Sequence, residues 1–123
     1  MKKLFLLSVF FLVVSVNPIQ AQKLKTEIWP ELQTVTEVAD RIDHNIKNDN
    51  AKAISHFSKT LLQHTEALVK STPPEAYRAV SPQAKKLLAA AIKLEDQKSE
   101  SEATQISTFR AYQKLLTQIQ EKK

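Results

Sequence analysis

The chain contains neither cysteine nor glycine, and these two absences exclude several classes of site. Without cysteine there is no disulfide, no thiolate-ligated zinc or iron–sulfur centre, no CxxCH attachment of haem and no lipid anchor on an N-terminal cysteine. Without glycine, the phosphate-binding loops, dinucleotide fingerprints and nucleophile elbows of many enzymes cannot form. The tight turns of a hairpin-rich β fold also favour glycine, so the composition favours a helical protein.

A hydrophobic run stands near the N-terminus, where residues 1–21 have the three-part plan of a secretory signal peptide. Lys2-Lys3 forms a basic start, residues 4–16 are almost entirely apolar, and Ile19-Gln20-Ala21 ends in a small residue suited to cleavage. The apolar run of about 13 residues is shorter than the ~20 residues that a membrane-spanning helix needs. We therefore predict cleavage after Ala21, leaving residues 22–123 as one domain, periplasmic or secreted, with no membrane span.

The predicted mature chain has no strong excess of either charge. Of the 18 lysine and arginine residues, Lys2 and Lys3 leave with the signal peptide, so 16 remain against 13 acidic residues and the formal net charge falls from +5 to +3. Acidic residues lie between the basic ones, and only Lys85-Lys86 and Lys122-Lys123 are adjacent pairs. A nucleic-acid-binding protein is expected to show a basic stripe with groove-reading or aromatic elements. The charge distribution therefore predicts no nucleic-acid partner.

Apolar residues recur at three- and four-residue steps in four stretches of the chain, which is the period of amphipathic helices. The positions are Ile28, Leu32, Val35, Ala39, Ile42 and Ile46 in the first stretch; Ile54, Phe57, Leu61, Thr65 and Leu68 in the second; Ala84, Leu87, Leu88, Ala91, Ile92 and Leu94 in the third; and Ile106, Phe109, Tyr112, Leu116 and Ile119 in the fourth.

Polar or proline-containing segments separate the four predicted helices. Residues 47–50 form a short turn in which Asn or Asp can take the left-handed conformation usually given to glycine. Pro73 ends the second helix, and Ser81-Pro82 opens the third. These signals predict an all-α fold, an antiparallel up-down-up-down four-helix bundle. The alternative is a three-helix arrangement, in which the last two segments run together through residues 96–101.

Asp40, His44 and His56 are the best candidates for a metal site. Asp40 and His44 stand four residues apart on one helical face, and the turn near Asn48 brings His56 back toward that level. Imidazole and carboxylate groups suit zinc and copper. The competing interpretation is that these side chains are solvated, because both histidines point away from the apolar stripes of their helices. No motif for a catalytic nucleophile or acid–base pair is present, so no catalytic residue is predicted.

Trp29 and the broad apolar face of the third helix suggest a lid and a contact surface, because they exceed what one bundle is expected to bury. Trp29 lies to the side of the first apolar stripe, where it either covers the end of the bundle or lines a partner surface. Leu87 and Leu94 broaden the apolar face of the third helix. Together with Trp29 they support a homodimer hypothesis.

The stretch from Leu32 to Pro74, which leads into Thr72-Pro73-Pro74, and the segment Arg110-Ala111-Tyr112-Gln113 resemble the soluble periplasmic cytochrome b562 family. The resemblance implies a four-helix bundle scaffold. That family holds haem between a methionine of the first helix and a histidine of the last, but here Val35 and Gln113 take these places. The resemblance therefore implies the scaffold without its haem ligands.

The sequence thus predicts an exported, non-enzymatic protein of binding or interaction type, without a resident cofactor and with an envelope protein as a partner. The first alternative is a periplasmic copper or zinc carrier using the three candidate ligands, and the second is a haem-binding electron carrier.

The metal hypothesis predicts stoichiometric, sub-micromolar binding of copper(II) or zinc(II) to residues 22–123, because two imidazoles and a carboxylate would converge. Calorimetric titration measures this affinity, and exchanging His44 and His56 for alanine should abolish it. Unchanged affinity in that variant would contradict the proposed ligands.

Overall fold

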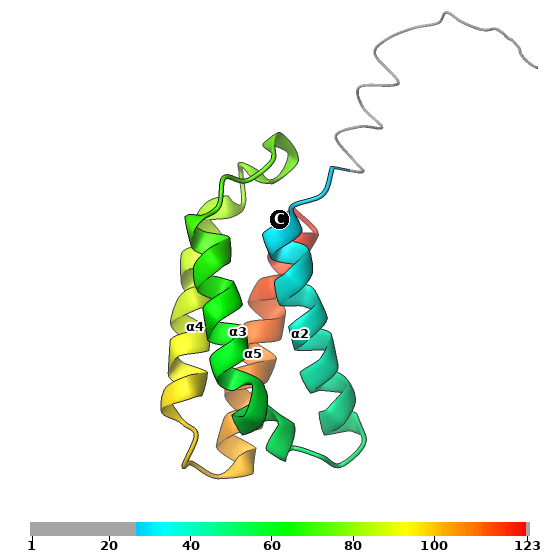
Figure 1. Cartoon of the computed structure of the whole chain (residues 1–123), viewed down its shortest axis with the longest axis vertical. Helices are drawn as coiled ribbons and strands as arrows, with labels where there is room; N and C mark the ends of the chain where they lie inside the picture. Colours follow the sequence, from blue (N-terminus) through cyan, green and yellow to red (C-terminus); the bar gives the residue numbers. More distant parts are fainter. Residues whose placement is uncertain (1–26, 123) are drawn as a thin grey trace, which may run out of the picture.

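The structure, a computed structural model, describes residues 27–122, so the predicted signal peptide lies outside the described part of the chain (Figure 1). These residues form four α-helices and no strand, which confirms the all-α prediction. The helices are α2 (Pro30–Lys47), α3 (Lys52–Lys70), α4 (Ala84–Asp96) and α5 (Glu102–Gln120), and two 3₁₀ turns, η1 (Glu75–Tyr77) and η2 (Ser81–Gln83), lie between α3 and α4. Within residues 27–122, none of these helices is sufficiently long and apolar to cross a bilayer.

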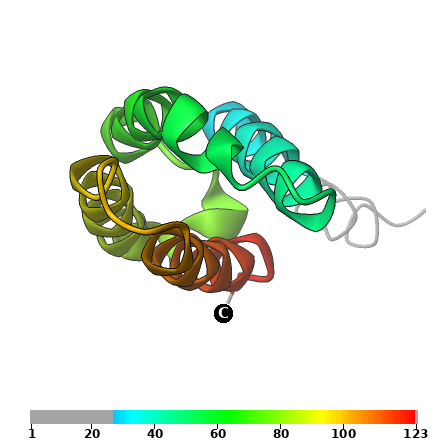
Figure 2. The same ribbon diagram turned by 90° about the horizontal axis from the view of Figure 1, so that it is seen from below.

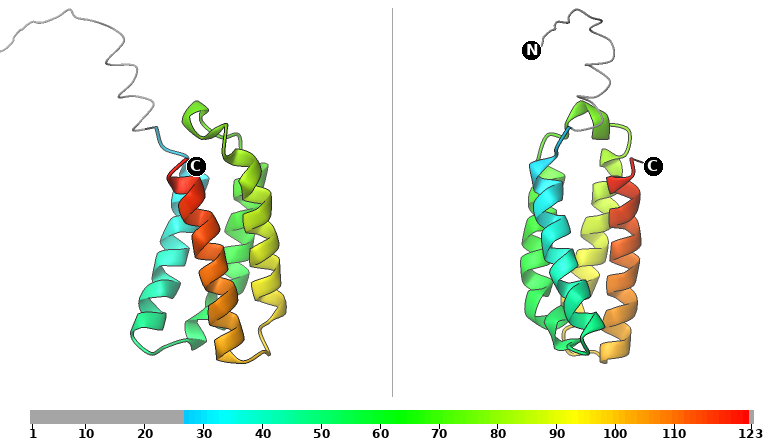
Figure 3. Two further views of the ribbon diagram at one scale, coloured as in Figure 1. Left: turned by 180° about the vertical axis from the view of Figure 1, so that it is seen from behind. Right: turned by 90° about the vertical axis from the view of Figure 1, so that its right-hand side faces the viewer.

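The four helices pack side by side around a shared core (Figure 2). Each contacts the next along the chain, and α5 also contacts α2 and α3. Figure 3 shows that the connection between α3 and α4 lies at the same end of the molecule as the start of α2 and the end of α5. Because α4 ends at Asp96 and α5 begins at Glu102, the three-helix alternative is wrong.

Local signals place the helix ends close to the predicted positions. Pro30 is the first residue of α2, where the missing N–H of proline costs nothing. Asp49 has a φ of 63°, so it takes the left-handed conformation that glycine usually provides in such turns. Ser101 caps α5 by accepting a hydrogen bond of 3.2 Å from the backbone N–H of Thr104.

The buried apolar residues largely match the predicted stripes, but two predicted core residues are exposed. Ile28 is 61% exposed because it precedes Pro30 and lies in extended chain, where helical periodicity does not apply. Ile92 is 44% exposed. The buried face of α4 is defined by Leu87, Ala91 and Leu94, and a residue one step after Ala91 is turned about 100° away from that face.

The three side chains that suggested a homodimer are buried within a single chain. Trp29 is 2% exposed, Leu94 1% and Leu87 0%. The expectation that they exceed what one bundle can bury is therefore wrong, since α4 has neighbours in both α3 and α5. Self-association no longer has support from these residues.

Hydrogen bonds between polar side chains hold the turn between α4 and α5 in place. The apolar periodicity of the sequence did not predict these bonds. Gln105 is buried, accepts a hydrogen bond of 2.8 Å from the Ser55 hydroxyl, and donates to the backbone oxygens of Lys98 and Glu100. Ser58 donates a hydrogen bond of 2.6 Å to Glu95, which lowers the pKa of that carboxyl. These bonds join α3, α4 and α5 at one end of the molecule.

A buried hydroxyl pair joins the middle of α3 to α5. The Thr65 hydroxyl donates to the Leu61 carbonyl oxygen at 2.6 Å, so the Tyr112 hydroxyl is the donor in the 2.8 Å bond between Tyr112 and Thr65. Both residues are fully buried. Burial raises the pKa of the Tyr112 phenol.

Removing the Thr65 hydroxyl should destabilise the fold more than removing the Tyr112 hydroxyl. Thr65→Val leaves the Tyr112 O–H buried without an acceptor and should lower the free energy of unfolding by about 2 kcal/mol. Tyr112→Phe leaves the Thr65 hydroxyl bound to Leu61 and should cost about 1 kcal/mol or less. Urea denaturation of both variants measures the difference. Equal losses, or a larger loss for Tyr112→Phe, would contradict this assignment of donor and acceptor.

Asp43 on α2 makes an ion pair with Arg110 on α5 and another, of 3.0 Å, with Lys47. The Arg110 hydrogen bond and then the Lys47 hydrogen bond lower the pKa of Asp43 from 3.8 to about 2. The carboxylate therefore stabilises the fold above about pH 4, and this contribution is lost as the pH falls through about 2.

Asp43→Asn should reduce the free energy of unfolding by about 1 kcal/mol at pH 7, since both cationic partners are exposed to solvent. The difference from the unmodified protein should shrink as the pH is lowered from about 4 to 2. Denaturation at a series of pH values measures it, with the exposed Asp40→Asn as control on the same helix. A difference that stays constant over this range would argue against the ion pair.

Candidate functional site

The predicted metal ligands Asp40, His44 and His56 are all exposed. The His44 ring nitrogen Nε2 lies 3.2 Å from the side-chain nitrogen of Asn48, and His56 packs edge-on against the Phe57 ring at 4.7 Å. Across residues 27–122, no three His, Cys, Asp or Glu side chains lie in an arrangement that could hold a metal ion. The structure therefore leaves the three candidate ligands without a shared centre.

His56 instead lines a depression of about 240 Å³ beside the α2–α3 turn. Asn45, Asn50 and Lys52 also line it, and the Asn50 side chain donates a hydrogen bond of 3.0 Å to Asn45. The lysine charge opposes a bound cation at this position. The amides are engaged with each other, so this depression is a polar turn surface rather than a metal centre.

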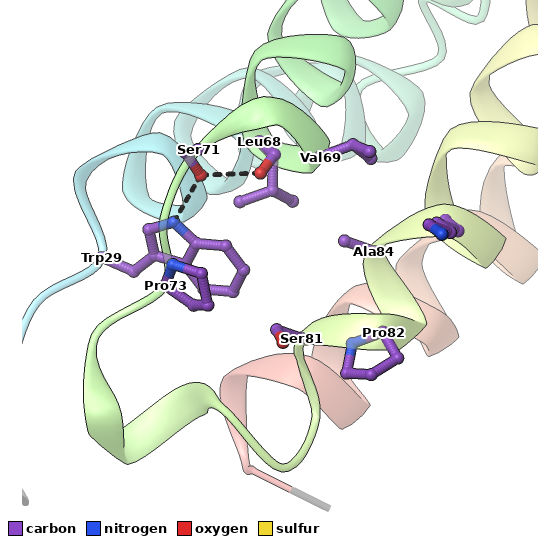
Figure 4. Close-up of a pocket in the computed structure, with 9 residues that line it drawn as sticks. Trp29, Leu68, Val69, Ser71, Pro73, Ser81, Pro82 and Ala84 are labelled. Carbon is purple, nitrogen blue, oxygen red and sulfur yellow. Dashed lines mark hydrogen bonds between the residues drawn. The ribbon is translucent and has the colours of Figure 1, made fainter.

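The opposite end of the molecule is built around Trp29. Its indole N–H donates a hydrogen bond of 2.8 Å to the Ser71 hydroxyl, which in turn donates to the Leu68 carbonyl oxygen at 2.6 Å (Figure 4). Ser71 stands just after α3, where the following Thr72-Pro73 prevents the helix from continuing. The bond therefore ties the residue before α2 to the residue after α3. Trp29 is buried and covers an end of the core, which is one of the two roles that the sequence left open.

The connection between α3 and α4 is held over this end by three further contacts. The Glu27 carboxylate accepts a hydrogen bond of 3.0 Å from the Ala76 backbone N–H. The Tyr77 ring lies 5.6 Å from the Trp29 ring, and the Lys122 ammonium lies 4.6 Å from the centre of the Tyr77 ring. Val80 from the same connection is buried in the core. These contacts position the connection without any disulfide.

A pocket of about 240 Å³ opens beside Trp29, between the end of α3 and the start of α4. In Figure 4, Trp29 and Pro73 lie on one side of it, and Ser81, Pro82 and Ala84 on the other. We call it the Trp29 pocket, and its lining is Trp29, Leu68, Val69, Ser71, Pro73, Ser81, Pro82, Ala84 and Lys85. Most of these side chains are apolar, which is typical of sites that bind small organic molecules.

A second depression, of about 220 Å³, is also lined by Trp29. Ile28, Leu32, Tyr77 and Gln120 contribute to it, and Trp29 is common to both depressions. The exposed Ile28 side chain belongs to this surface. Trp29 therefore contributes to two partly apolar hollows at one end of the molecule.

Lys85 supplies the only formal charge in the lining of the Trp29 pocket. The side chain is exposed, and within residues 27–122 it makes neither an ion pair nor a hydrogen bond. The first turn of α4, in which Lys85 stands, contains no acidic residue, and no side chain caps this helix start. The positive end of the helix dipole therefore reinforces the lysine charge.

The sequence left Trp29 as either a lid or part of a partner surface, and it did not indicate the pocket. In the sequence, each of the other lining residues has a simple local interpretation. Ser71 marks the end of one helix, Pro82 marks the start of the next, and Lys85 is a surface lysine. The available signal was the pair of proline-flanked helix ends around residues 71–83, which predicts that the end of α3 and the start of α4 meet over a long connection.

Comparison with known proteins gives no assignment for this site. No protein family matches the chain, and no curated protein or solved structure matches it either.

Proposed function

We propose that this chain is an exported, non-enzymatic binding protein that holds a small, largely apolar ligand in the Trp29 pocket. The observation that supports the proposal is the pocket itself, with Leu68, Val69 and Pro82 lining it and the Trp29 indole as one wall. An apolar hollow with a few polar groups at its edge is the usual form of a small-molecule site. We therefore propose that the binding function predicted from the sequence resides in the Trp29 pocket.

The chemistry of the lining supports binding rather than catalysis. The residues around the Trp29 pocket include no histidine, aspartate, glutamate or cysteine. Its two hydroxyl groups, those of Ser71 and Ser81, both donate to backbone carbonyl oxygens. General acid–base or nucleophilic catalysis needs a titratable group within hydrogen-bond reach of the reacting atoms. Lys85 is the one titratable side chain of the lining, so the lining offers no acid–base pair and no nucleophile beside a base.

The scaffold is proposed to be an antiparallel up-down-up-down bundle, as the sequence predicts. Thr36 bonds to Gln120 and Asp43 pairs with Arg110, so increasing numbers on α2 meet decreasing numbers on α5. By contrast, Ser55 bonds to Gln105 and Thr65 to Tyr112, so α3 and α5 increase together. These pairings are what alternating helix directions require.

The proposed likeness to the cytochrome b562 family extends to the scaffold only. Val35, at the place of that family's methionine ligand, is fully buried and apolar. Gln113, at the place of its histidine ligand, accepts a hydrogen bond from Arg110. Neither position favours a haem iron, and this supports a binding protein over an electron carrier.

Export is tested by the mass of the mature protein. Expression of the full chain in a host with a secretory pathway should place the protein in the exported fraction, with Gln22 at its N-terminus, because residues 1–21 have the composition of a signal peptide. Intact-mass measurement of that fraction determines the first residue. A full-length chain retained in the cytoplasmic fraction would contradict export.

Ligand binding is tested with neutral apolar probes, 1-octanol first. Trp29 is the only tryptophan, so its fluorescence should change and saturate as the pocket fills. The amide NMR signals of Val69 and Ala84 should shift, whereas that of Ala53, which does not line this pocket, should stay in place.

A filling variant and its matched control give the binding experiment its specificity. Val69→Phe adds volume to the lining and should weaken binding, and Leu62→Phe places the same aromatic side chain on the same face of α3 outside the pocket. Thermal melts check that both variants fold, since overpacking can cost about 1–3 kcal/mol. The absence of saturable change with neutral and charged probes alike would contradict the proposed function.

A further inference from the structure

We propose that the Trp29 pocket selects an aliphatic monocarboxylate, with the hydrocarbon chain among its apolar side chains and the carboxylate at Lys85. The inference rests on the proposed function, because it names the ligand class of the same pocket. It depends on three features of the lining: its apolar interior, its limited volume and the number of side-chain donors that remain available.

The apolar side chains and the volume define the body of the ligand. Leu68, Val69, Pro73, Pro82 and Ala84 offer methyl, methylene and ring carbon atoms, which bind a hydrocarbon through the hydrophobic effect. The volume of about 240 Å³ lies just below the ~300–1,000 Å³ typical of pockets for drug-sized ligands. A short or medium aliphatic chain therefore fits better than a fused ring system or a two-chain lipid.

The hydrogen-bond donors of the lining define the head group. The Trp29 N–H is used by Ser71, the Ser71 hydroxyl by Leu68, and the Ser81 hydroxyl by the Arg78 carbonyl oxygen at 3.1 Å. The Lys85 ammonium is then the one side-chain donor of the lining that makes no bond within residues 27–122. Among the side chains of the lining, Lys85 therefore offers the donor that a head group can use.

The sign and size of the charge favour a carboxylate. A single ammonium matches the charge of a monoanion, whereas a phosphate group carries about −1.5 to −2 charges at pH 7 and would be only partly neutralised by it. The uncapped start of α4, with no acidic residue in its first turn, adds positive potential on the same side. A cationic amphiphile of equal chain length is disfavoured by the same charges.

The experiment compares three probes of equal chain length: octanoate, 1-octanol and octylammonium. The two ions are kept below their micelle concentrations, and 1-octanol is kept below its solubility limit. Binding is followed by Trp29 fluorescence and by the amide signals of Val69 and Ala84. Octanoate should bind about fivefold more tightly than 1-octanol, as expected for a charge-assisted contact that is partly screened by solvent. Octylammonium should bind more weakly than 1-octanol.

Two adjacent lysines supply the variant and its control. Lys85→Gln should bring the affinity for octanoate down to that for 1-octanol, and Lys86→Gln should leave the ratio unchanged, since Lys86 is exposed and does not line the pocket. Both positions are on the surface, so neither change should impair folding.

The outcomes separate the two proposals. Equal binding of octanoate and 1-octanol, or equal effects of the two lysine variants, would overturn carboxylate selection while leaving a binding pocket in place. Octanoate binding that persists in Val69→Phe would place the carboxylate outside this pocket and also overturn the inference. Failure of every probe to bind would overturn both proposals.

Discussion

The burial of the Trp29 indole holds together the end of the molecule that carries the candidate pocket. Its N–H group reaches Ser71, 42 positions further along the chain, so one hydrogen bond links the start of α2 to the end of α3. In a chain without cysteine, no disulfide can make such a link. The closure therefore depends on an aromatic ring that is 2% exposed and on the satisfaction of its polar atom.

The two ends of the helical core differ in chemistry, and this difference supports the proposed ligand site at the Trp29 end. At the end with the α4–α5 turn, Ser55, Ser58, Gln105 and Thr108 are engaged with other side chains or backbone oxygens. At the Trp29 end, the polar side chains of the pocket are also satisfied, except for Lys85. Saturated hydrogen bonds stabilise turns, whereas an apolar hollow beside an unpaired charge is available to a ligand.

The sequence predicted the helices well because their determinants are local. Apolar steps of three and four residues, Pro30, the Thr72-Pro73 stop and the Ser101 cap each act within a turn or two of helix, and the structure has helix ends at or near all of them. The same local pattern misplaced Ile28 and Ile92. Periodicity assigns a face only inside a helix, and the edge of a buried face depends on how closely a neighbouring helix approaches.

From its sequence alone, this protein is an all-α chain without thiol or glycine-loop chemistry. Only the tertiary structure decided that Asp40, His44 and His56 share no centre and that Leu87 and Leu94 are buried within one chain. It alone brought Val69, Pro82 and Lys85 into one lining. The physical reason is that a helix sets the direction of a side chain around its own axis, whereas a pocket requires several segments to meet in space.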